Sequence, residues 1–371
     1  MARKLLKYTS VLAGLWAVSF ATYAAQQRHA ARRGVDKASL QDTVTHFIRE
    51  KFGLPDTVKM TPEPLEDSPD PEFYQGVIQV DNGKAVKPQP ISVSKNGRYV
   101  ALGHLYSLGA DTSDDIIQTI RQTFHIPPAM VISVGPFRPS PISSFYITTI
   151  TGDTNGKKQS TDFFVSKDKH YLLLGAVYTV MSRSEILHII NTHDQPYSGG
   201  SDAPVTIVEY ADLECPACAR VQAFLEGQLV PKYGNKVRLI YKEFPLPMHD
   251  WSRQAAIANE CAFQSQPSVF AKYRTLIFSH QTEINVANVR EKLLDYGEQV
   301  GLNRLKLAAC LDSKASLPRV ESGMREGQKL EVASTPTFFI NGQMVVGPGN
   351  PQTFYNLIDE DLRHDKQVAR R

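Results

Sequence analysis

The first half of the chain carries one pattern of apolar and polar positions twice. In its first copy, apolar residues recur at the three- and four-residue spacing of a helix: Val44, Phe47, Ile48 and Phe52. Asp42 is a candidate N-cap of this helix, and Pro55 ends it. Runs rich in β-branched and aromatic residues follow at 74–80, 91–93 and 99–105 and predict strands. The pattern therefore predicts a helix packed on a small antiparallel sheet.

The same pattern returns 72 residues later (120 − 48 = 72), where Ile120–Pro127 resembles Ile48–Pro55. The constant offset also pairs further segments: Val93–Lys95 with Val165–Lys167, Tyr99 with Tyr171, Leu102-Gly103 with Leu174-Gly175, and Tyr106 with Tyr178. We interpret residues 35–110 and 111–195 as two tandem copies of one α+β unit. The copies contain no cysteine and no convergent acid, base or metal set. We therefore expect them to bind or to assemble rather than to catalyse.

A different pattern begins after the polar stretch 196–203, which we interpret as a linker. Apolar runs predict strands in this half of the chain: 205–210, 237–241, 337–340 and 344–346. Helical spacing dominates between about 249 and 332, and a closing helix follows the last strand. The order of the elements predicts an α/β domain at 204–364 with a helical insertion at about 249–332, followed by a tail at 365–371.

Residues 1–34 have the pattern of a targeting segment. Positive charges within residues 3–7 precede an apolar run from about Tyr8 to Ala25, and Thr22-Tyr23-Ala24 is an acceptable cleavage site of a signal peptide. The length of the run also suits a membrane anchor. Both interpretations export the rest of the chain, to the periplasm or to the periplasmic side of the inner membrane. The net charge of +3 is too small to indicate a nucleic-acid partner.

The cysteines indicate redox chemistry. The chain has 4 cysteines, all of them in its second half, and cysteines of exported proteins commonly form disulfides. Cys215-Pro216-Ala217-Cys218 follows a predicted strand and opens a helix, which is typical of a redox CxxC motif and not of a zinc site. A thiolate at a helix N-terminus has a lowered pKa, because free N–H groups and the helix dipole stabilise it. We expect Cys215 to be exposed and to attack, and the more buried Cys218 to resolve the mixed disulfide.

Three motifs in order resemble the DsbA-like branch of the thioredoxin superfamily, over about residues 203–364: Val208-Glu209-Tyr210 with the CxxC motif, Tyr241–Leu246, and Thr335–Phe339. The resemblance implies a thioredoxin fold with an inserted helical domain. It also implies a cis Thr335–Pro336 bond beside the CxxC motif, with the Thr335 backbone pairing with the main chain of the substrate. Glu209 matches a buried acid of the family, and Lys242 is its expected partner. The alternative for both is an ordinary ion pair at a strand end.

The two N-terminal copies weakly resemble the dimerisation domain of the DsbC-type disulfide isomerases. The matching residues are Asn96–Tyr99 in the first copy and Lys169–Tyr171 in the second, each followed by a glycine and a tyrosine. Pairing of the two copies within one chain would satisfy the surface through which a single-copy relative dimerises. We therefore favour a monomer, with a dimer as the alternative.

Cys261 and Cys310 lie on predicted helices of the insertion. A disulfide between them would close a span of 49 residues (310 − 261). In the chain-entropy treatment such a span stabilises the fold by about 4 kcal/mol. We predict this disulfide, and the alternative is two unpaired buried thiols.

These features predict an enzyme that exchanges disulfides with unfolded or folding exported proteins through Cys215 and Cys218. The inserted helical domain favours an oxidase over an isomerase or a reductase, although all three would use the same residues. We expect an unidentified membrane redox partner and neither a cofactor nor a metal. The alternative from another class is an exported chaperone or copper-handling protein whose two cysteines bind a soft metal ion.

Overall fold

The structure is a computed structural model that describes residues 36–109, 113–140, 142–154, 156–347 and 350–368. The targeting segment expected at 1–34 lies outside the described residues. The described residues form two compact units, one of residues 36–45 and 59–180 and the other of residues 46–58 and 181–368. In this part of the chain, none of the helices combines the length and the apolar character needed to cross a membrane.

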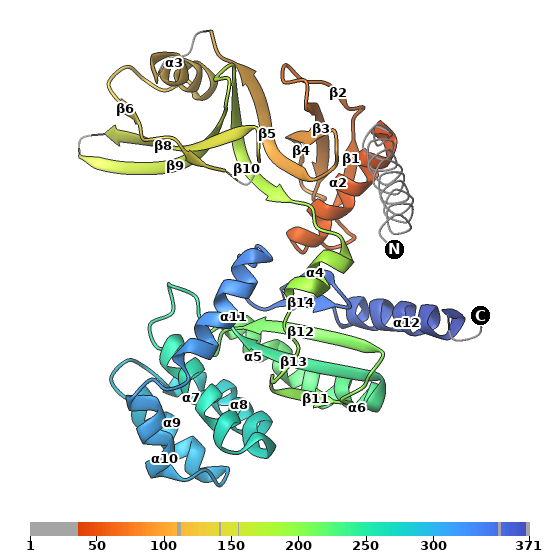
Figure 1. Ribbon diagram of the computed structural model, residues 1–371, viewed down its shortest axis with the longest axis vertical. Coiled ribbons are helices and arrows are strands. Elements are labelled where there is room, and N and C mark those ends of the chain that lie inside the picture. Colours follow the sequence, from red (N-terminus) through yellow and green to blue (C-terminus); the bar gives the residue numbers. More distant parts are fainter. Residues whose placement is uncertain (1–35, 110–112, 141, 155, 348–349, 369–371) are drawn as a thin grey trace, which may run out of the picture. The chain divides into compact units, whose positions relative to one another are not determined.

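Two copies of one arrangement, a helix followed by five strands, fill the first half of the chain (Figure 1). The first copy comprises α2 (Lys37–Lys51), β1 (Lys59–Pro62), β2 (Glu66–Asp67), β3 (Phe73–Asp81), β4 (Val86–Ser94) and β5 (Tyr99–Ser107). The second comprises α3 (Ser113–Phe124), β6 (Val131–Val134), β7 (Arg138–Pro139), β8 (Phe145–Thr154), β9 (Lys157–Ser166) and β10 (Tyr171–Thr179). The first strands of the copies begin 72 residues apart (131 − 59), as do the last strands (171 − 99), which confirms the tandem repeat.

A side-chain interaction also repeats at this offset. In the first copy, Nη2 of Arg49 donates to the carbonyl oxygen of Val58 at 2.8 Å. In the second, Nη2 of Arg121 donates to the carbonyl oxygen of Met130 at 2.7 Å. Each arginine thus ties its helix to the chain segment that leads into the next strand.

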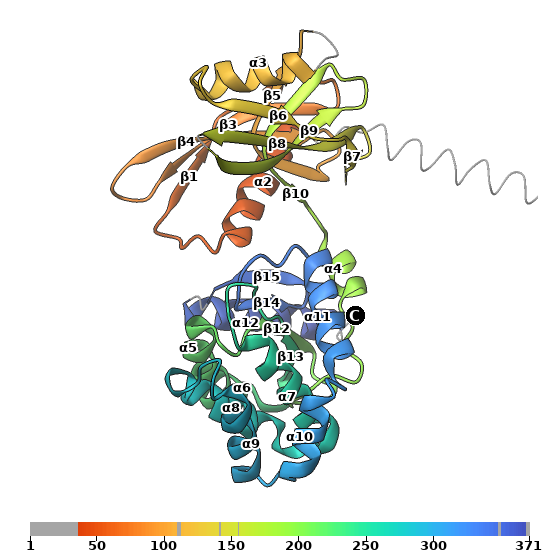
Figure 2. The same cartoon turned by 90° about the vertical axis from the view of Figure 1, so that its left-hand side faces the viewer.

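The two copies join in one ten-stranded antiparallel sheet, because β5 of the first copy pairs with β10 of the second (Figures 1 and 2). Gly103 and Gly175 lie directly opposite each other in this pairing. A Cβ on Gly103 would lie 1.6 Å from the carbonyl oxygen of Leu174, and Gly175 has a φ of +139°. Only glycine fits such a close approach at this backbone conformation. Each copy therefore contributes the glycine of its repeated Leu-Gly dipeptide to this close approach.

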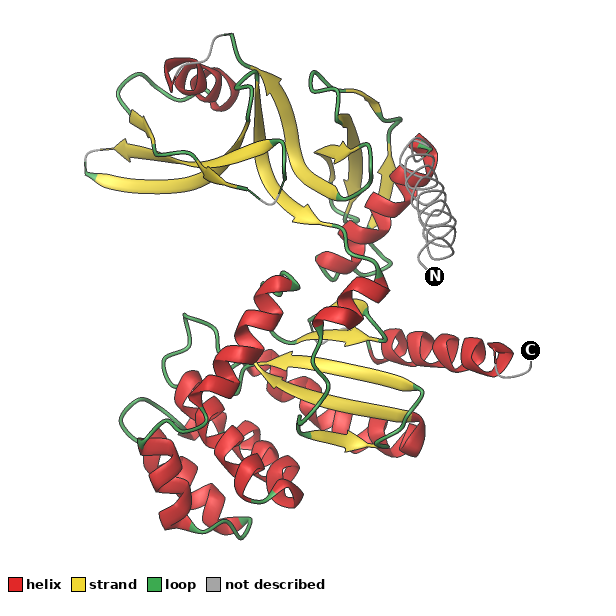
Figure 3. Cartoon of the chain, viewed as in Figure 1, coloured by secondary structure: helices red, strands yellow, loops and turns green. Residues whose placement is uncertain are grey.

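The second unit contains a five-stranded sheet with the order β11-β13-β12-β14-β15. The strands are β11 (Tyr197–Gly199), β12 (Val205–Ala211), β13 (Val237–Glu243), β14 (Thr337–Ile340) and β15 (Gln343–Val346). β12 and β13 are parallel, and the other pairs are antiparallel. Apolar residues of α5 (Pro216–Phe224), α6 (Val230–Tyr233) and α12 (Pro351–Val368) pack on one face of this sheet. α4 (Arg183–Ile189) and α11 (Leu317–Lys329) pack on the other, which gives three layers (Figure 3).

A helical insertion separates β13 from β14. It comprises α7 (Ser252–Ser265), α8 (Phe270–Ser279), α9 (Val289–Gln299), α10 (Arg304–Asp312) and the already defined α11. Figure 2 shows α8, α9 and α10 grouped beyond the end of the sheet. Most buried apolar residues of α7–α10 form one cluster that also includes Cys215 and Cys218. The fold is the expected α/β thioredoxin fold with an inserted helical domain.

The predicted disulfide between Cys261 and Cys310 is present and links α7 to α10. The two Cα atoms are 6.0 Å apart. Cys261 is buried and Cys310 is partly buried against the same apolar cluster. The bond therefore closes the helical insertion on itself.

The predictions of a linker at 196–203 and of a tail at 365–371 need correction. Tyr197–Gly199 forms β11, an edge strand paired with β13. Ser198 donates to Oε1 of Glu226 at 2.9 Å and accepts from the Tyr241 hydroxyl at 2.8 Å. The glycines suggested flexibility, but a Cβ on Gly199 would lie 2.1 Å from the Val237 carbonyl oxygen, so close packing explains that glycine. At the other end, residues 365–368 continue α12.

Candidate active site

The cysteines of the CxxC motif lie where β12 leads into α5. Cys215 is the N-cap residue of α5, and Pro216 occupies the first helical turn. Both cysteines are free thiols. Cys218 is fully buried, and only 7% of Cys215 is exposed. The prediction of an exposed Cys215 is therefore wrong, because its thiol donates to the Thr335 carbonyl oxygen at 3.4 Å and lies under the segment that precedes β14.

The two thiols are perturbed in opposite directions. A hydrogen bond from the Cys218 thiol lowers the pKa of Cys215 to about 5, although burial acts against it. The backbone N–H groups of Cys218 and Ala217 act in the same direction, as expected at a helix N-terminus. Burial raises the pKa of Cys218 far above its ordinary value, and Cys215 and the charge of Glu209 add to the effect. The pair therefore consists of a stable thiolate beside a stable thiol.

The Thr335–Pro336 peptide bond is cis, as the family resemblance implied. The Pro336 carbonyl oxygen accepts from the Gly347 backbone at 2.8 Å, which ties this segment to the end of β15. The Thr335 side chain is buried, and its hydroxyl has no hydrogen-bond partner among the described residues. The carbonyl of Thr335 faces the Cys215 thiol. The structure thus brings Cys215, Cys218, Thr335 and Pro336 together.

Beneath the cysteines, Glu209 belongs to a fully buried group of charges. Its Oε2 accepts from Nη2 of Arg274 on α8 at 3.0 Å. The other guanidinium nitrogen of Arg274 donates to Oε1 of Glu243 at 2.9 Å, and Asn259 donates to the same oxygen at 2.7 Å. The guanidinium also lies over the rings of Tyr241 and Phe278, at 5.0 and 4.9 Å from their centroids. Two carboxylates and two aromatic rings therefore favour the charge of Arg274.

Lys242 is not the partner of Glu209, so that expectation is wrong. In the parallel register of β12 and β13, Glu209 lies opposite Tyr241, and Lys242 lies opposite Tyr210. Because side chains alternate along a strand, Lys242 points to the other face of the sheet. There its Nζ lies 3.0 Å from Oε1 of Glu326 and donates to the Asn191 carbonyl oxygen at 2.6 Å. Lys242 thus belongs to an ion pair remote from the cysteines.

Residues 191–360 match the family model described as Thioredoxin. These residues, somewhat under half of the chain, form a thioredoxin-like domain. Among curated relatives, Na(+)/H(+) antiporter NhaA 3 of Salinispora tropica is 33% identical over 153 residues, which are 41% of this chain and 22% of the antiporter. Disulfide bond formation protein D of Bacillus subtilis is 25% identical over 174 residues, 46% of this chain and 78% of that protein. The chain spans about a quarter of the length of the antiporter relatives.

Solved structures also align with this half of the chain. Oxidised BdbD from Bacillus subtilis aligns with a TM-score of 0.44 at 23% identity, over 47% of this chain and 95% of that chain. The catalytic domain of ScsC from Proteus mirabilis aligns with a TM-score of 0.43 at 20% identity, over 49% of this chain and 99% of that chain.

Two residues of the thioredoxin domain that bear on the site were missed in the sequence. Arg274 was read only as part of a helical pattern, although Phe270 and Phe278 lie four residues to either side of it on the same face of α8. An arginine within an apolar helical face needs a buried acidic partner, so the spacing of Phe270, Arg274 and Phe278 could have indicated a buried ion pair. Glu243 follows Lys242 at the end of β13. Because side chains alternate along a strand, Glu243 lies on the same face of the sheet as Tyr241, and this pattern could have placed it on the face that carries Glu209.

A second arrangement holds the turn before Cys215. The buried carboxylate of Asp212 accepts from the Glu214 and Leu246 backbone N–H groups at 2.8 and 2.7 Å. It also lies 2.7 Å from Nδ1 of His249. Burial lowers the pKa of His249, but the hydrogen bond and the charge of Asp212 raise it overall, and the Cys215 charge adds to this. The raised pKa favours the positively charged form of His249 beside Asp212.

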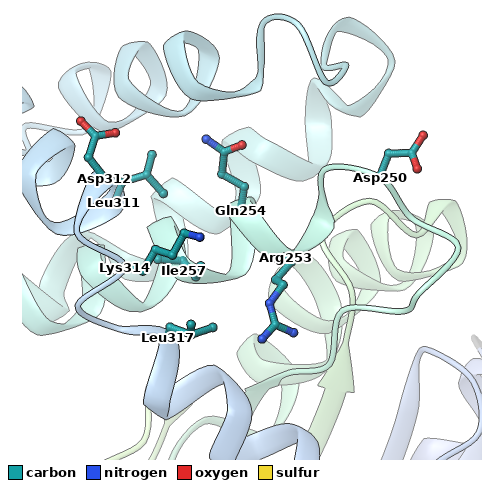
Figure 4. Close-up of a pocket in the computed structure, with 8 residues that line it drawn as sticks. All are labelled: Asp250, Arg253, Gln254, Ile257, Leu311, Asp312, Lys314 and Leu317. Atoms are coloured by element: carbon teal, nitrogen blue, oxygen red, sulfur yellow. The ribbon is translucent and has the colours of Figure 1, made fainter.

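A pocket of about 410 Å³ opens on the helical insertion of the thioredoxin domain (Figure 4). It is lined by apolar, polar and charged side chains: Asp250, Arg253, Gln254, Ile257, Leu311, Asp312, Lys314 and Leu317. It contains none of the predicted site residues. Among the residues that the structure describes, no group of three or more His, Cys, Asp or Glu side chains could hold a metal ion.

Proposed function

We propose that this chain is an exported thiol–disulfide oxidoreductase that exchanges disulfides with unfolded or folding exported proteins through Cys215 and Cys218. The observation that carries the proposal is the opposite perturbation of the two thiols, with the pKa of Cys215 lowered to about 5 and that of Cys218 raised. A nucleophile must be a thiolate, whereas a resolving thiol must wait until the mixed disulfide has formed. The similarity to a protein named for disulfide bond formation supports the proposal.

The steps follow from the positions of the sulfur atoms. In the reducing direction, the Cys215 thiolate attacks a substrate disulfide and forms a mixed disulfide, while one substrate sulfur leaves as a thiolate. Cys218 then attacks Cys215, which releases the second substrate sulfur and leaves the domain oxidised. An oxidase runs these steps in reverse. The backbone of Thr335, next to the cis bond, would pair with the substrate main chain and align its sulfur with Cys215.

The oxidase direction is the one that the electrostatics favour. A low pKa of Cys215 stabilises the reduced form at neutral pH, which makes the disulfide form a stronger oxidant. Ala217 contributes no charge to this stabilisation. Hydrogen bonds from Cys218 and from the backbone N–H groups at the helix N-terminus lower the pKa instead.

Export and the redox partner complete the proposal. Residues 1–34 would carry the chain across the inner membrane, as a cleaved signal peptide or as an anchor. An oxidase is reduced once in each turnover and needs an acceptor for two electrons. A membrane protein of the same compartment would fill that role.

The decisive experiment compares Cys215→Ser with Cys218→Ser in the presence of an exported protein that carries disulfides. We expect Cys215→Ser to abolish exchange and Cys218→Ser to accumulate mixed disulfides, because attack proceeds without resolution. Adducts are counted by non-reducing electrophoresis and mass spectrometry. Adducts on Cys215→Ser in place of Cys218→Ser would reverse the assignment. Stoichiometric Cu(I) binding without any exchange would contradict the oxidoreductase.

A further inference from the structure

The buried cluster of charged residues below the cysteines contains two acidic side chains and only one basic side chain. Glu209, Glu243 and Arg274 all lie in the core, with the two carboxylates on the two nitrogens of one guanidinium. Asn259 is neutral and donates to Glu243. Ionisation of both carboxyls would leave one uncompensated negative charge in the buried interior, which is strongly unfavourable.

Each of the two carboxyl groups has one oxygen that is hydrogen-bonded and one that is not. Oε1 of Glu209 and Oε2 of Glu243 have no partner among the described residues, whereas the other oxygen of each is bonded to Arg274. A proton on either free oxygen makes the group electrically neutral. Burial raises the pKa of Glu243 to about 7, and it also raises that of Glu209. Two acids that interact this closely titrate as a pair.

This pair is coupled to the cysteines. β12 and β13 place Glu209 and Glu243 on the same face of the sheet, because Glu209 lies opposite Tyr241 and Ala211 lies opposite Glu243. The charges of Glu209 and Arg274 both interact with Cys218. Two further carboxyls act on this group: Glu226 on Glu209 and Arg274, and Glu260 from α7 on Glu243.

We propose that Glu243 shares with Glu209, through Arg274, the proton that Cys218 loses when it resolves a mixed disulfide. The inference rests on the proposed function and adds a residue to it. As Cys218 attacks Cys215, the bond between their sulfurs forms and the bond from Cys215 to the substrate sulfur breaks. The Cys218 proton passes to the carboxyl pair, and the substrate sulfur leaves as a thiolate. The dithiol is oxidised and the substrate disulfide is reduced, so no further reactant is needed.

The presence of Glu243 beside Glu209 makes the carboxyl pair a stronger proton acceptor. A single carboxylate paired with Arg274 would be a stable ion pair and a weak base. Two carboxylates that compete for one guanidinium form a stronger base, which accepts a proton near neutral pH. Glu243 touches no reacting sulfur, so it is a positioning residue for the proton on Glu209.

Glu243→Gln in the full chain tests the inference through the two phases of the reaction with Ellman's reagent. Attack by Cys215 releases the first thionitrobenzoate, and resolution by Cys218 releases the second. We expect an unchanged first phase. The pH midpoint of the second phase should fall by about one unit or more, and its plateau rate by about tenfold. Absence of the first phase in the unmodified protein would refute the proposed function instead of this inference.

Two matched variants separate proton sharing from structure and from general electrostatics. Glu243→Asp keeps a titratable carboxyl and should restore the midpoint. Glu226→Gln removes a nearby carboxyl that is not bonded to Arg274, and because Glu226 has only a minor effect on the pKa of Glu209, it should shift the midpoint much less than Glu243→Gln. An unchanged second phase in Glu243→Gln, or an equal shift in Glu226→Gln, would overturn the inference.

Infrared spectroscopy of the unmodified protein covers the case in which Glu243→Gln does not fold. A protonated buried carboxyl has a distinct carbonyl stretching band, and we expect this band to disappear as the pH rises through neutrality. A spectrum without such a band would equally overturn the inference.

Discussion

Replacing Cys218 with alanine removes the largest single contribution that lowers the pKa of Cys215. A hydrogen bond to a charged group is worth about 1.5–3 kcal/mol. At about 1.4 kcal/mol per pKa unit, its loss raises the pKa of a buried thiolate by about 1–2 units. From a starting value of about 5, the pKa of Cys215 in the variant should lie at roughly 6–7. The N–H groups at the start of α5 remain and keep it below the ordinary value.

The assay is the rate of alkylation of the reduced protein by iodoacetamide as a function of pH, with the modified peptide identified by mass spectrometry. At pH 5 about half of Cys215 is thiolate in the unmodified protein, and about a tenth or less in Cys218→Ala. The alkylation rate at that pH should therefore fall by about 5- to 50-fold. Cys215→Ser serves as the control for labelling elsewhere, since Cys261 and Cys310 are joined in a disulfide.

Two results would refute this reasoning. A Cys218→Ala midpoint that matches the unmodified protein would show that the Cys218 thiol does not stabilise the thiolate. A midpoint near the ordinary thiol value in the unmodified protein would show that the site does not lower the pKa of Cys215 at all.

Three further predictions concern the fold and assembly. Cys261→Ala with Cys310→Ala should lower the free energy of unfolding by about 4 kcal/mol, measured by urea denaturation, because the bond closes a span of 49 residues; an unchanged midpoint would contradict this. Gly175→Val should cost about 3 kcal/mol or more, because its φ is +139° and a Cβ would lie 2.3 Å from the Leu102 carbonyl oxygen. Gly227→Ala, with open space around it, is the matched control, and equal effects would argue against the close approach. A chain that begins near residue 35 should sediment as a monomer at micromolar concentration, because β5 pairs with β10 within the chain; a dimer that persists on dilution and is lost on deletion of 35–195 would show pairing between chains.

Much of the architecture could be predicted because its signals are local or periodic. The offset of 72 residues was visible as recurring residues in the sequence. It recurs in the strand boundaries because similar sequences form similar local structure. The CxxC motif at a helix start needs only its neighbours to be recognised. The cis Thr335–Pro336 bond could be predicted only from the family resemblance.

The errors arose where a local signal had more than one structural meaning. Glycines at 199 and 200 suggested a flexible linker, but close packing of β11 against β13 also requires glycine. A residue at a helix N-terminus was expected to be exposed, yet a segment 120 residues away covers Cys215. Composition does not separate these alternatives.

The sequence by itself determined the order of the elements, the tandem repeat and the placement of a reactive cysteine at a helix N-terminus, because propensity, periodicity and capping act between near neighbours. Only the tertiary structure decided which charges meet. Glu209 pairs with Arg274, 65 residues further along the chain, and Lys242 faces the opposite side of the sheet. The strand register and the docking of α8 select these partners, and both result from burial of apolar surface over the whole domain, a quantity that no short segment contains.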